Sequence, residues 1–198
     1  TLVLVQFAQT RDRGQVCSND PRTFKGQNST AVRGTTIAFY SDACLLTSDR
    51  NIMADVNRIF NYLEQPKTRI ALLKSCKTLL VSPTGMRRQL LQLINKEIKT
   101  AELKKPASII LKLNSLSDEL LIDKLYEAAK AGVEVKLIIR GIFCLLTENK
   151  KFRIPIQAIS IVDEYLEHSR IMIFHNGGKE RTFISSADWM LRNIDHRV

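Results

Sequence analysis

His168 stands out in a chain that has three histidines in 198 residues. It follows Glu167 directly and lies two residues before Arg170, just ahead of the apolar run 171–174. A histidine can act as a nucleophile or as a general acid or base near neutral pH. A neighbouring arginine could hold the anion on which it works. A surface histidine at a helix end would be placed in the same way, because its protonated form suits the helix dipole. The residues alone leave both interpretations open.

Arg140 is a second candidate, because it follows directly on an apolar strand pattern. That pattern spans residues 133–141, and Asn114 ends the strand pattern before it at 108–114. Ligands of open α/β sheets bind beyond the carboxyl ends of the strands, so we expect Asn114 and Arg140 to lie near each other. A guanidinium there can grip a phosphate with paired donors. An arginine that simply reaches solvent past the sheet edge fits the pattern equally well.

Arg87 and Arg88 fall in the first turn of a predicted helix. Cations at this end oppose the helix dipole. Their placement suggests an anion near the helix start, where free N–H groups also point. Two solvated arginines on the outer helix face are the alternative.

Short polar side chains follow the last predicted strand, at Ser185, Ser186 and Asp188, ahead of Arg192 and Asn193. They suit a phosphate pocket, and they equally suit a turn with a helix N-cap.

The sequence gives less reason to expect a functional role for the other two histidines. His175 lies in a Gly-Gly turn and His196 lies near the end of the chain, so we expect both to be surface residues.

The elements that must position these residues follow from hydrophobic periodicity. Strands are expected at 2–7, 36–40, 79–81, 108–114, 133–141, 170–174 and 181–185, the last two as neighbours joined by the turn HNGGKE. Residues 8–34 are polar and are expected to form a loop. The segment 154–168 is predicted to be mostly helical or mixed.

Three helices are expected, each with an identifiable end. The first is capped by Ser48 or Asp49 and ends near residue 65, with an apolar face of Ile52, Val56, Ile59, Phe60 and Leu63. The second is capped by Ser82 and buries Leu90, Leu91, Ile94 and Ile98. The third covers 117–132 and ends at Gly132; with the strands on either side it predicts a right-handed βαβ unit.

Composition limits the class of partner. The chain has 30 Lys and Arg against 20 Asp and Glu, a net charge of +10. This excess favours nucleic acid, a phosphorylated metabolite, polyphosphate or an anionic membrane surface, without choosing among them. The hydrophobic content of 44% is typical of a globular protein.

The four cysteines are Cys17, Cys44, Cys76 and Cys144, too scattered for a zinc motif. We expect reduced thiols in a cytoplasmic protein. No apolar run reaches the roughly 18 residues that span a bilayer. The chain starts without an initiator Met or the features of a signal peptide, and we expect it to be a piece of a longer protein.

Several motifs that would indicate another type of enzyme are missing from the sequence. It contains no GxxxxGK[ST] phosphate loop, no HExxH zinc motif and no GxSxG nucleophile motif. Aromatic residues make up 7% of the chain and are not interleaved as in RNA-binding sheets.

Four stretches together resemble the bacterial polyphosphate kinase family, the long type with a phosphorylated histidine. They are SDACLLTSDRNIMADVNRIFNYLE, LLVSPTGMRRQLLQLINKEI, LKLNSLSDELLIDKLYEAAKAGVEVKLIIRGI and AISIVDEYLEHSRIMIFHNGGKERTFISSADWMLRNID. The resemblance runs in order over most of residues 36–198. It implies an α/β fold similar to phospholipase D, a mixed sheet flanked by helices. Residues 1–70 would be the end of a first such domain, and 71–198 would be most of a second.

The resemblance also implies roles for residues. The family transfers the terminal phosphate of ATP reversibly to polyphosphate, through a phosphohistidine and with magnesium. That histidine would fall a few residues before Thr1, and the Mg²⁺ ligands also outside this chain. The second essential histidine of the family matches His168 in YLEH. The residues that contact ATP in the family match Tyr40 in FYSD, Arg140 in IIRG and His168.

One segment departs from the family. A Gly-rich loop similar to TGNFNE is expected shortly before the tyrosine, and the chain instead reads NSTAVRGTTIAFY. This leaves the first domain's phosphate-binding loop, and the role of residues 8–35, open.

We therefore expect part of a polyphosphate kinase, inactive as a kinase by itself. The implied partners are ATP or ADP and polyphosphate, in a homo-oligomer, with no specific nucleic acid and with peripheral membrane association left open. A phospholipase D-like phosphodiesterase or nuclease is one alternative, although its chemistry usually uses HxK where this chain has HSR. A non-catalytic polyanion-binding module is the other.

Overall fold

The computed structural model describes residues 40–41, 43, 45–66, 69–161 and 166–197. The strand expected at 2–7 and the loop expected at 8–34 lie outside these residues. Of the strand expected at 36–40, only Tyr40 is described, and it begins the two-residue strand β1, Tyr40–Ser41.

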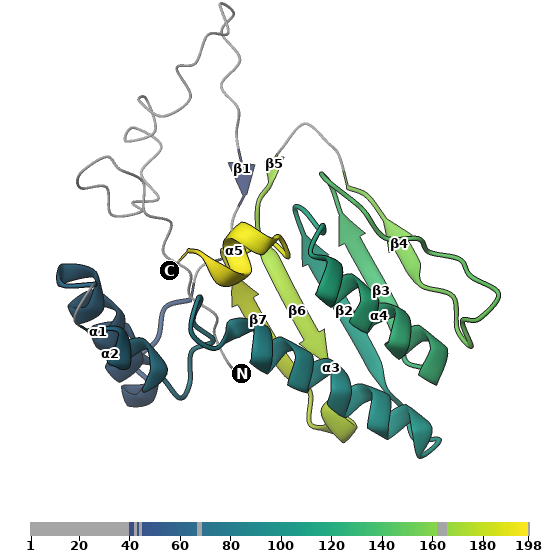
Figure 1. Ribbon diagram of the computed structural model, residues 1–198, viewed down its shortest axis with the longest axis horizontal. Helices are drawn as coiled ribbons and strands as arrows, with labels where there is room; N and C mark the ends of the chain where they lie inside the picture. Colours follow the sequence, from purple (N-terminus) through teal and green to yellow (C-terminus); the bar gives the residue numbers. More distant parts are fainter. Residues whose placement is uncertain (1–39, 42, 44, 67–68, 162–165, 198) are drawn as a thin grey trace, which may run out of the picture.

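The core of the fold is a mixed five-stranded sheet in the order β4-β3-β2-β6-β7 (Figure 1). Strands β2, β3 and β4 run parallel, and β6 runs antiparallel to both of its neighbours, β2 and β7. The bounds are Ser108–Leu113 for β2, Glu134–Ile139 for β3, Gln157–Ile159 for β4, Arg170–Phe174 for β6 and Arg181–Ser185 for β7. The expected class, an α/β protein with a mixed sheet and flanking helices, is confirmed.

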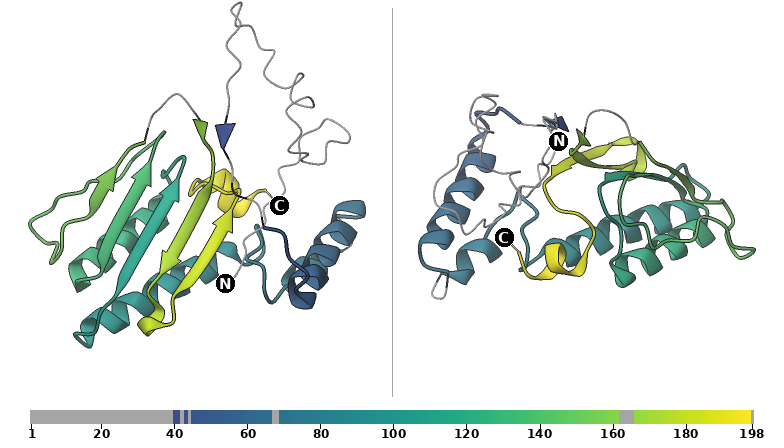
Figure 2. Two further views of the ribbon diagram at one scale, coloured as in Figure 1. Left: turned by 180° about the vertical axis from the view of Figure 1, so that it is seen from behind. Right: turned by 90° about the horizontal axis from the view of Figure 1, so that it is seen from above.

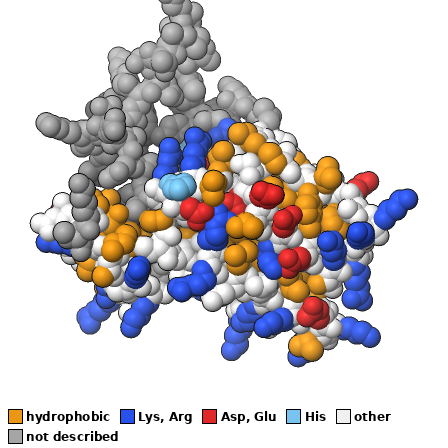
Figure 3. All heavy atoms as spheres, viewed as in Figure 1, with side chains coloured by type: hydrophobic (Ala, Val, Ile, Leu, Met, Phe, Trp, Pro, Cys, Tyr) orange, Lys and Arg blue, Asp and Glu red, His pale blue; other side chains and the backbone are white. Residues whose placement is uncertain are grey.

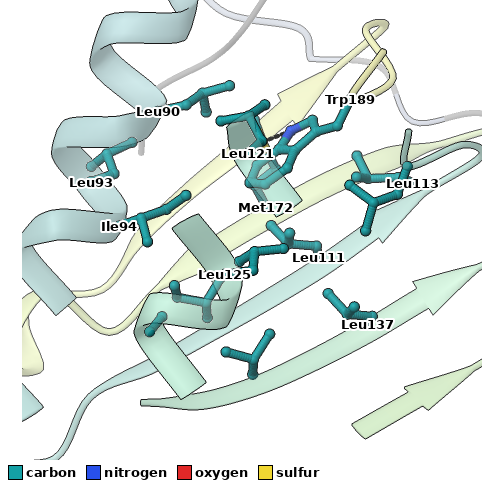
Figure 4. Packing of buried hydrophobic residues seen from close by; sticks show 14 of the residues in the cluster. Leu90, Leu93, Ile94, Leu111, Leu113, Leu121, Leu125, Leu137, Met172 and Trp189 are labelled. Atoms are coloured by element: carbon teal, nitrogen blue, oxygen red, sulfur yellow. Dashed lines mark hydrogen bonds between the residues drawn. The ribbon is translucent and has the colours of Figure 1, made fainter. Parts of the chain in front are cut away.

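Helices α3 (Met86–Glu102) and α4 (Glu119–Ala131) cover one face of this sheet, as the right-hand view of Figure 2 shows. Every second side chain of β2 and β3 is buried, because alternate residues of a strand point to the same face. Figure 4 shows these strands meeting the helices through leucine side chains, with Trp189 closing one end of the core. The indole Nε1 of Trp189 donates to Met172 Sδ at 3.3 Å, so its polar atom is satisfied within the core.

The predicted βαβ unit is confirmed in its order, direction and ends. Asp118 caps α4 by accepting a hydrogen bond from the N–H of Leu121. Gly132 ends the helix in the left-handed region, at φ 97°, a conformation that costs glycine little because it has no Cβ. The chain then enters β3, whose residues pair in parallel register with those of β2.

Replacing Gly132 with alanine is expected to lower the free energy of unfolding by about 1–2 kcal/mol, because an L side chain is strained at positive φ. A Cβ at this position would come within 3.0 Å of Arg153 Cδ, the far part of a flexible side chain, so backbone strain and not collision sets the cost. Urea unfolding measures the effect. Gly132→Asn is expected to lose less, because asparagine adopts this conformation more readily; an equal loss in both variants would contradict the explanation.

A smaller helical unit precedes this domain. Helix α1 (Arg50–Glu64) is capped by Asp49, which accepts from the N–H groups of Asn51 and Ile52, as expected for one of the two predicted caps. Its apolar face packs on α2 (Ile70–Lys74) and on the chain that follows it. The prediction of this face was wrong at Phe60, whose side chain is 53% exposed among the described residues.

Asp55 fastens this unit to the following chain. It is 1% exposed, and its Oδ2 accepts hydrogen bonds from the backbone N–H groups of Lys77, Thr78 and Leu79. A buried carboxylate needs such donors to replace its hydration.

The strand predicted at 79–81 is wrong. No sheet edge adjoins these residues in the described structure, and the N–H of Leu79 is taken by Asp55. The apolar pattern instead reflects two cores: Leu79 and Val81 lie in the small one, and Leu80 lies in the large one. The predicted cap was also wrong, because α3 begins at Met86 after Gly85, and the Ser82 hydroxyl donates to the Ile194 carbonyl at 2.8 Å.

The helical prediction for 154–168 is wrong for the described residues. Gln157–Ile159 form β4 at the sheet edge, and Leu166–Glu167 form β5, which pairs in parallel with β1. Pro155 disfavours helix in the residue before it, and Ile156, Ala158 and Ile159 suit a short edge strand. The remaining elements are a 3₁₀ turn, Asn176–Gly178, and the short helix α5, Leu191–Asp195. Among the described helices, none is both long enough and apolar enough to cross a membrane.

Candidate functional site

One edge of the sheet collects the candidate residues. Strands β2, β3 and β7 end at this edge, and β6 begins there, because β6 runs opposite to both of its neighbours. In Figure 1 this is the upper edge of the sheet, where β5 leads into β6. The expected ligand-binding position at the carboxyl ends of the parallel strands is therefore also the position of His168.

Arg140 and Asn114 meet at this edge, as the sequence predicts. The Nε of Arg140 donates to Asn114 Oδ1 at 2.7 Å. The side-chain amide of Asn114 in turn lies 3.5 Å from the carbonyl oxygen of His168, at the limit of a hydrogen bond. Within the described part of the chain, neither terminal nitrogen of the Arg140 guanidinium has a hydrogen-bond partner. The guanidinium is thus oriented through Nε, while its two NH₂ groups have no acceptor among the described residues.

Asp188 lies at the centre of the edge. Its Oδ1 accepts from the backbone N–H groups of Asn114 at 2.8 Å and Ser115 at 3.0 Å, and from Arg170 Nε at 3.3 Å. Its Oδ2 accepts from Arg170 Nη2 at 3.1 Å. Both charged side chains are close to fully buried, at 9% exposure for Arg170 and 11% for Asp188. The strand-end carboxylate is thus a structural anchor, and the phosphate-pocket interpretation is wrong for Asp188.

His168 is held from the opposite side of Arg170. The Nη1 of Arg170 donates to the His168 carbonyl at 2.9 Å and lies 3.0 Å from the ring nitrogen Nδ1 and 3.4 Å from Nε2. The His168 side chain is partly exposed. Because Arg170 is buried and divided between Asp188 and His168, the idea that it holds the anion itself is wrong. It holds the histidine.

Lys112 supports the same segment. Its Nζ donates to the carbonyl and the hydroxyl of Ser169, at 3.0 and 2.9 Å. The segment of residues 168–170 is therefore tied to β2 as well as to β7.

Tyr40 reaches this region through the second, smaller sheet. In the pairing of β1 with β5, Tyr40 stands opposite Leu166 and Ser41 stands opposite Glu167, the residue before His168. The backbone of Tyr40 thus lies in the strand beside the one that leads to His168. Only this backbone position of Tyr40 is described.

The start of α3 differs from the prediction. Arg87 is neither solvated nor open to an external anion, because Asp118 and Asp195 bind it from α4 and α5 at 2.6 to 3.0 Å. Two protein carboxylates are therefore the anions at this helix end. Burial alone would raise the pKa of Asp118, but hydrogen bonds from Arg87 and from the Leu121 N–H outweigh it and hold the pKa below its usual value.

Arg88 is exposed, as one of the two interpretations expected. It lines two clefts of about 430 and 510 Å³ beside Thr84 and Gly85. Neither cleft is lined by His168, Arg140 or Arg170, so the clefts are separate from the sheet edge.

Charges of both signs are mixed on the face formed by α3 and α4. Figure 3 shows the face formed by α3 and α4, where Lys and Arg side chains are spread out with Asp and Glu between them. The charge pattern of this face therefore does not mark a binding site on it, and the argument for the candidate site rests on particular side chains at the sheet edge.

The comparisons with known proteins agree with the fold and with the resemblance. The family model described as polyphosphate kinase C-terminal domain 2 matches residues 79–198. The polyphosphate kinases of Salmonella typhimurium and Klebsiella pneumoniae are 45% and 47% identical over 163 residues, 82% of this chain. The crystal structure of polyphosphate kinase from Porphyromonas gingivalis superposes with a TM-score of 0.73 at 43% identity, over 81% of this chain.

The chain belongs to the polyphosphate kinase family.

It spans only part of such a protein: 23% of the length of the two sequence relatives and 24% of the structural one. A role that needs the rest of a polyphosphate kinase must therefore be tested in a protein of the relatives' full length.

Sequence reasoning did not identify the anchoring roles of Arg170 and Asp188 at this edge of the sheet. One signal was available. Arg170 has the same strand parity as Met172 and Phe174, which face the core. A charge on the core-facing side of a strand requires a partner, and Asp188, near the end of the neighbouring strand, is such a partner.

Proposed function

We propose that this chain forms the part of a polyphosphate kinase that binds the phosphates of ATP and polyphosphate at the edge described above. The observation that carries the proposal is the pair formed by Arg140, whose NH₂ groups have no protein acceptor among the described residues, and His168, joined to it through Asn114. The reaction would be the reversible transfer of the terminal phosphate of ATP to the polyphosphate chain. Its phosphohistidine would be supplied by residues outside this chain.

The chemistry suits the groups at the edge. Phosphoryl transfer depends chiefly on positioning and on stabilising charge that spreads over the phosphate oxygens. Arg140 would bind those oxygens with two parallel N–H donors, which a guanidinium provides in fixed geometry. His168 would lie beside the transferring group, where it stabilises charge or moves a proton. Tyr40 would contact the nucleotide.

Magnesium, which the resemblance implies, does not fit the described residues. No group of three or more His, Cys, Asp or Glu residues in the described ranges could hold a metal ion. Asp188, the buried carboxylate of the edge, already accepts four hydrogen bonds. We propose, as the resemblance implies, that the Mg²⁺ ligands come from outside this chain.

The division of the chain also remains a proposal. We place a boundary near residue 70, with the end of one phospholipase D-like domain before it and most of a second after it. Two separate apolar clusters, one around α1 and α2 and one around the sheet, support a division into two units; the smaller cluster includes Leu73, Leu79 and Val81, so it places residues 70–81 with the first unit.

The test is an assay of a full-length polyphosphate kinase in which this chain replaces the corresponding segment. We expect ATP-dependent lengthening of polyphosphate and no hydrolysis of a phosphodiester. Phosphodiesterase activity without phosphate transfer would favour the phospholipase D-like alternative. Salt-dependent DNA binding, with no preference for ATP or polyphosphate, would favour a polyanion-binding module.

Arg140→Gln in the same protein is expected to raise the KM for ATP by about 10- to 100-fold, the effect of losing one or two hydrogen bonds from a charged donor. Arg153→Gln is the matched control, because Arg153 is an exposed arginine that follows β3 in the chain and lies against Gly132 before that strand. Equal effects of the two substitutions on KM would remove Arg140 from the binding site.

A further inference from the structure

Asn114 is the residue that holds the guanidinium of Arg140 at the sheet edge. Its Oδ1 accepts a hydrogen bond from Arg140 Nε at 2.7 Å. An arginine donates hydrogen bonds and accepts none, so the oxygen of the amide must be the atom that faces it. The NH₂ group of the amide then faces the carbonyl oxygen of His168, at 3.5 Å. The orientation of the Asn114 side chain is thus determined by its two neighbours.

The backbone of Asn114 is fixed as well. Its N–H donates to Asp188 Oδ1 at 2.8 Å, and its carbonyl oxygen accepts from the Gly141 N–H at 2.8 Å. A Cβ at Gly141 would come within 2.7 Å of this carbonyl oxygen, a backbone atom that cannot swing aside. The ends of β2 and β3 therefore approach as closely as a glycine permits, and Asn114, at 7% exposure, is held within reach of Arg140.

Arginines that hold the fold together are bound in another way. The two oxygens of Asp188 take both Nε and Nη2 of Arg170, and two carboxylates bind Arg87. Arg140 makes no ion pair among the described residues. An amide carries no charge and has one acceptor oxygen, so Asn114 orients the guanidinium through Nε alone. The positive charge and the two NH₂ groups of Arg140 are left available.

We propose that Asn114 is a positioning residue that orients Arg140 without neutralising it, so that the guanidinium keeps its charge for a phosphoryl group. A fixed cation with two parallel N–H donors matches two oxygens on one phosphorus atom. The role at phosphate rests on the proposed function. The orienting contact rests only on the geometry above.

Two substitutions of Asn114 separate this role from a structural one. Aspartate has almost the shape of asparagine, and it could bind Nε and Nη2 of Arg140 as Asp188 binds those of Arg170. If Asn114 served only to hold the arginine, Asn114→Asp would be milder than Asn114→Ala, because it keeps the hydrogen bond that alanine loses. If the charge of Arg140 must stay available, Asn114→Asp is the harsher substitution.

We expect the KM for ATP of the full-length protein to rise by about 3- to 10-fold in Asn114→Ala, the effect of losing one orienting hydrogen bond. In Asn114→Asp it should rise by about 100-fold, because a carboxylate then neutralises the cation and repels the phosphate. In both variants kcat should change much less than KM.

Asn149→Asp is the matched control and should leave KM unchanged. Asn149 is exposed and follows β3 in the chain, and its Oδ1 accepts from the Lys151 N–H at 2.9 Å, a contact that a carboxylate can also make.

A spectroscopic readout follows the contact apart from catalysis. An arginine Nε–H held in a hydrogen bond exchanges slowly with water and gives a resolved ¹H–¹⁵N signal, which Arg140→Gln assigns in the 198-residue chain. We expect the Arg140 signal in the unchanged chain and in Asn114→Asp, and its loss in Asn114→Ala, with the Arg87 signal unaltered in all three. A structural role alone does not predict a variant that keeps this signal and still loses affinity for ATP.

The outcomes distinguish this proposal from the proposed function. An Asn114→Ala variant with a higher KM than Asn114→Asp, or with an unaltered Arg140 signal, overturns the positioning role. If Arg140→Gln raises KM and neither Asn114 variant does, the positioning role falls and the proposed function stands. If none of the three raises KM while the signal is lost in Asn114→Ala, the contact stands and the role at phosphate falls. Should Asn114→Asp fail to fold by circular dichroism, Asn114→Ala decides, and an unchanged KM then overturns the proposal.

Discussion

A full-length polyphosphate kinase that carries this chain with His168→Ala is expected to make polyphosphate about 100- to 10,000-fold more slowly, the range for removing a positioned proton donor or acceptor. The substitution removes the ring and leaves the backbone carbonyl that Arg170 and Asn114 bind. The supporting network should therefore persist, and the loss should fall on kcat. The measurement is the initial rate of polyphosphate formation at saturating ATP.

The matched control is His175→Ala. His175 follows the opposite end of β6, where its ring caps the 3₁₀ turn. It should keep the rate of the unchanged protein. His168→Gln is a useful third variant, because its amide offers an N–H donor and should recover part of the activity if donation is what matters. Synthesis at an unchanged rate in His168→Ala would exclude a catalytic role for this histidine.

Sequence reasoning recovers the parts of the fold that are set by local periodicity. Strands β2 and β3 were predicted from their apolar patterns. Helix α4 was predicted from its helical apolar spacing and from Gly132, the glycine at its end. The meeting of Asn114 and Arg140 follows from the same logic, since parallel neighbours end at one edge.

Partners distant in sequence were not recoverable in this way. Residues 79–81 form a continuous apolar run that is typical of a buried strand. They instead bridge two cores, and Asp55 accepts hydrogen bonds from the backbone N–H of Leu79 and of the two residues before it. The segment around β4 has enough aliphatic residues for a helix, and its place at a sheet edge is decided by β3. Such choices depend on tertiary neighbours that propensity does not contain.

The candidate site was likewise predictable from the sequence only in part. Sequence gives the residue types that could bind phosphate, and the fold decides which remain available for it. Arg140, Arg170 and Arg87 all looked like anion ligands, yet Arg170 and Arg87 are bound by carboxylates far away in the chain. Only the fold separates an arginine whose terminal nitrogens have no acceptor among the described residues, as in Arg140, from one that holds the protein together.

Arg87 and Arg88 allow this distinction to be tested directly. Arg87→Gln is expected to lower the free energy of unfolding near neutral pH by about 3 kcal/mol, because it leaves the carboxylates of Asp118 and Asp195 without a cation. Asp118 is 2% exposed and Arg87 is 18% exposed, so the pair is largely shielded from water. In a chain of this length the loss corresponds to a midpoint lower by roughly 6–12 °C. Urea unfolding measures the free energy, and circular dichroism follows the midpoint.

Acid should reduce the difference in the free energy of unfolding between the unchanged chain and Arg87→Gln. The pKa of Asp118 is lowered in the folded chain, so its contribution is complete above its unfolded value of 3.8 and is lost as the pH falls through the folded value. Without Arg87 the opposing effect, burial, raises the pKa of this carboxyl, and protonation then relieves an unpaired charge. The unchanged chain therefore loses stability below pH 3.8 while the variant loses less, and the gap between them narrows.

Arg88→Gln supplies the control for both parts of this prediction. It removes the same charge from the neighbouring position of the same helix turn, but the Arg88 side chain is exposed and makes no ion pair among the described residues. Its effect should stay within about 0.5 kcal/mol, as for most surface substitutions, and should not change with pH. Equal losses in the two variants, or a gap for Arg87→Gln that stays constant into acid, would mean that the two carboxylates do not depend on Arg87.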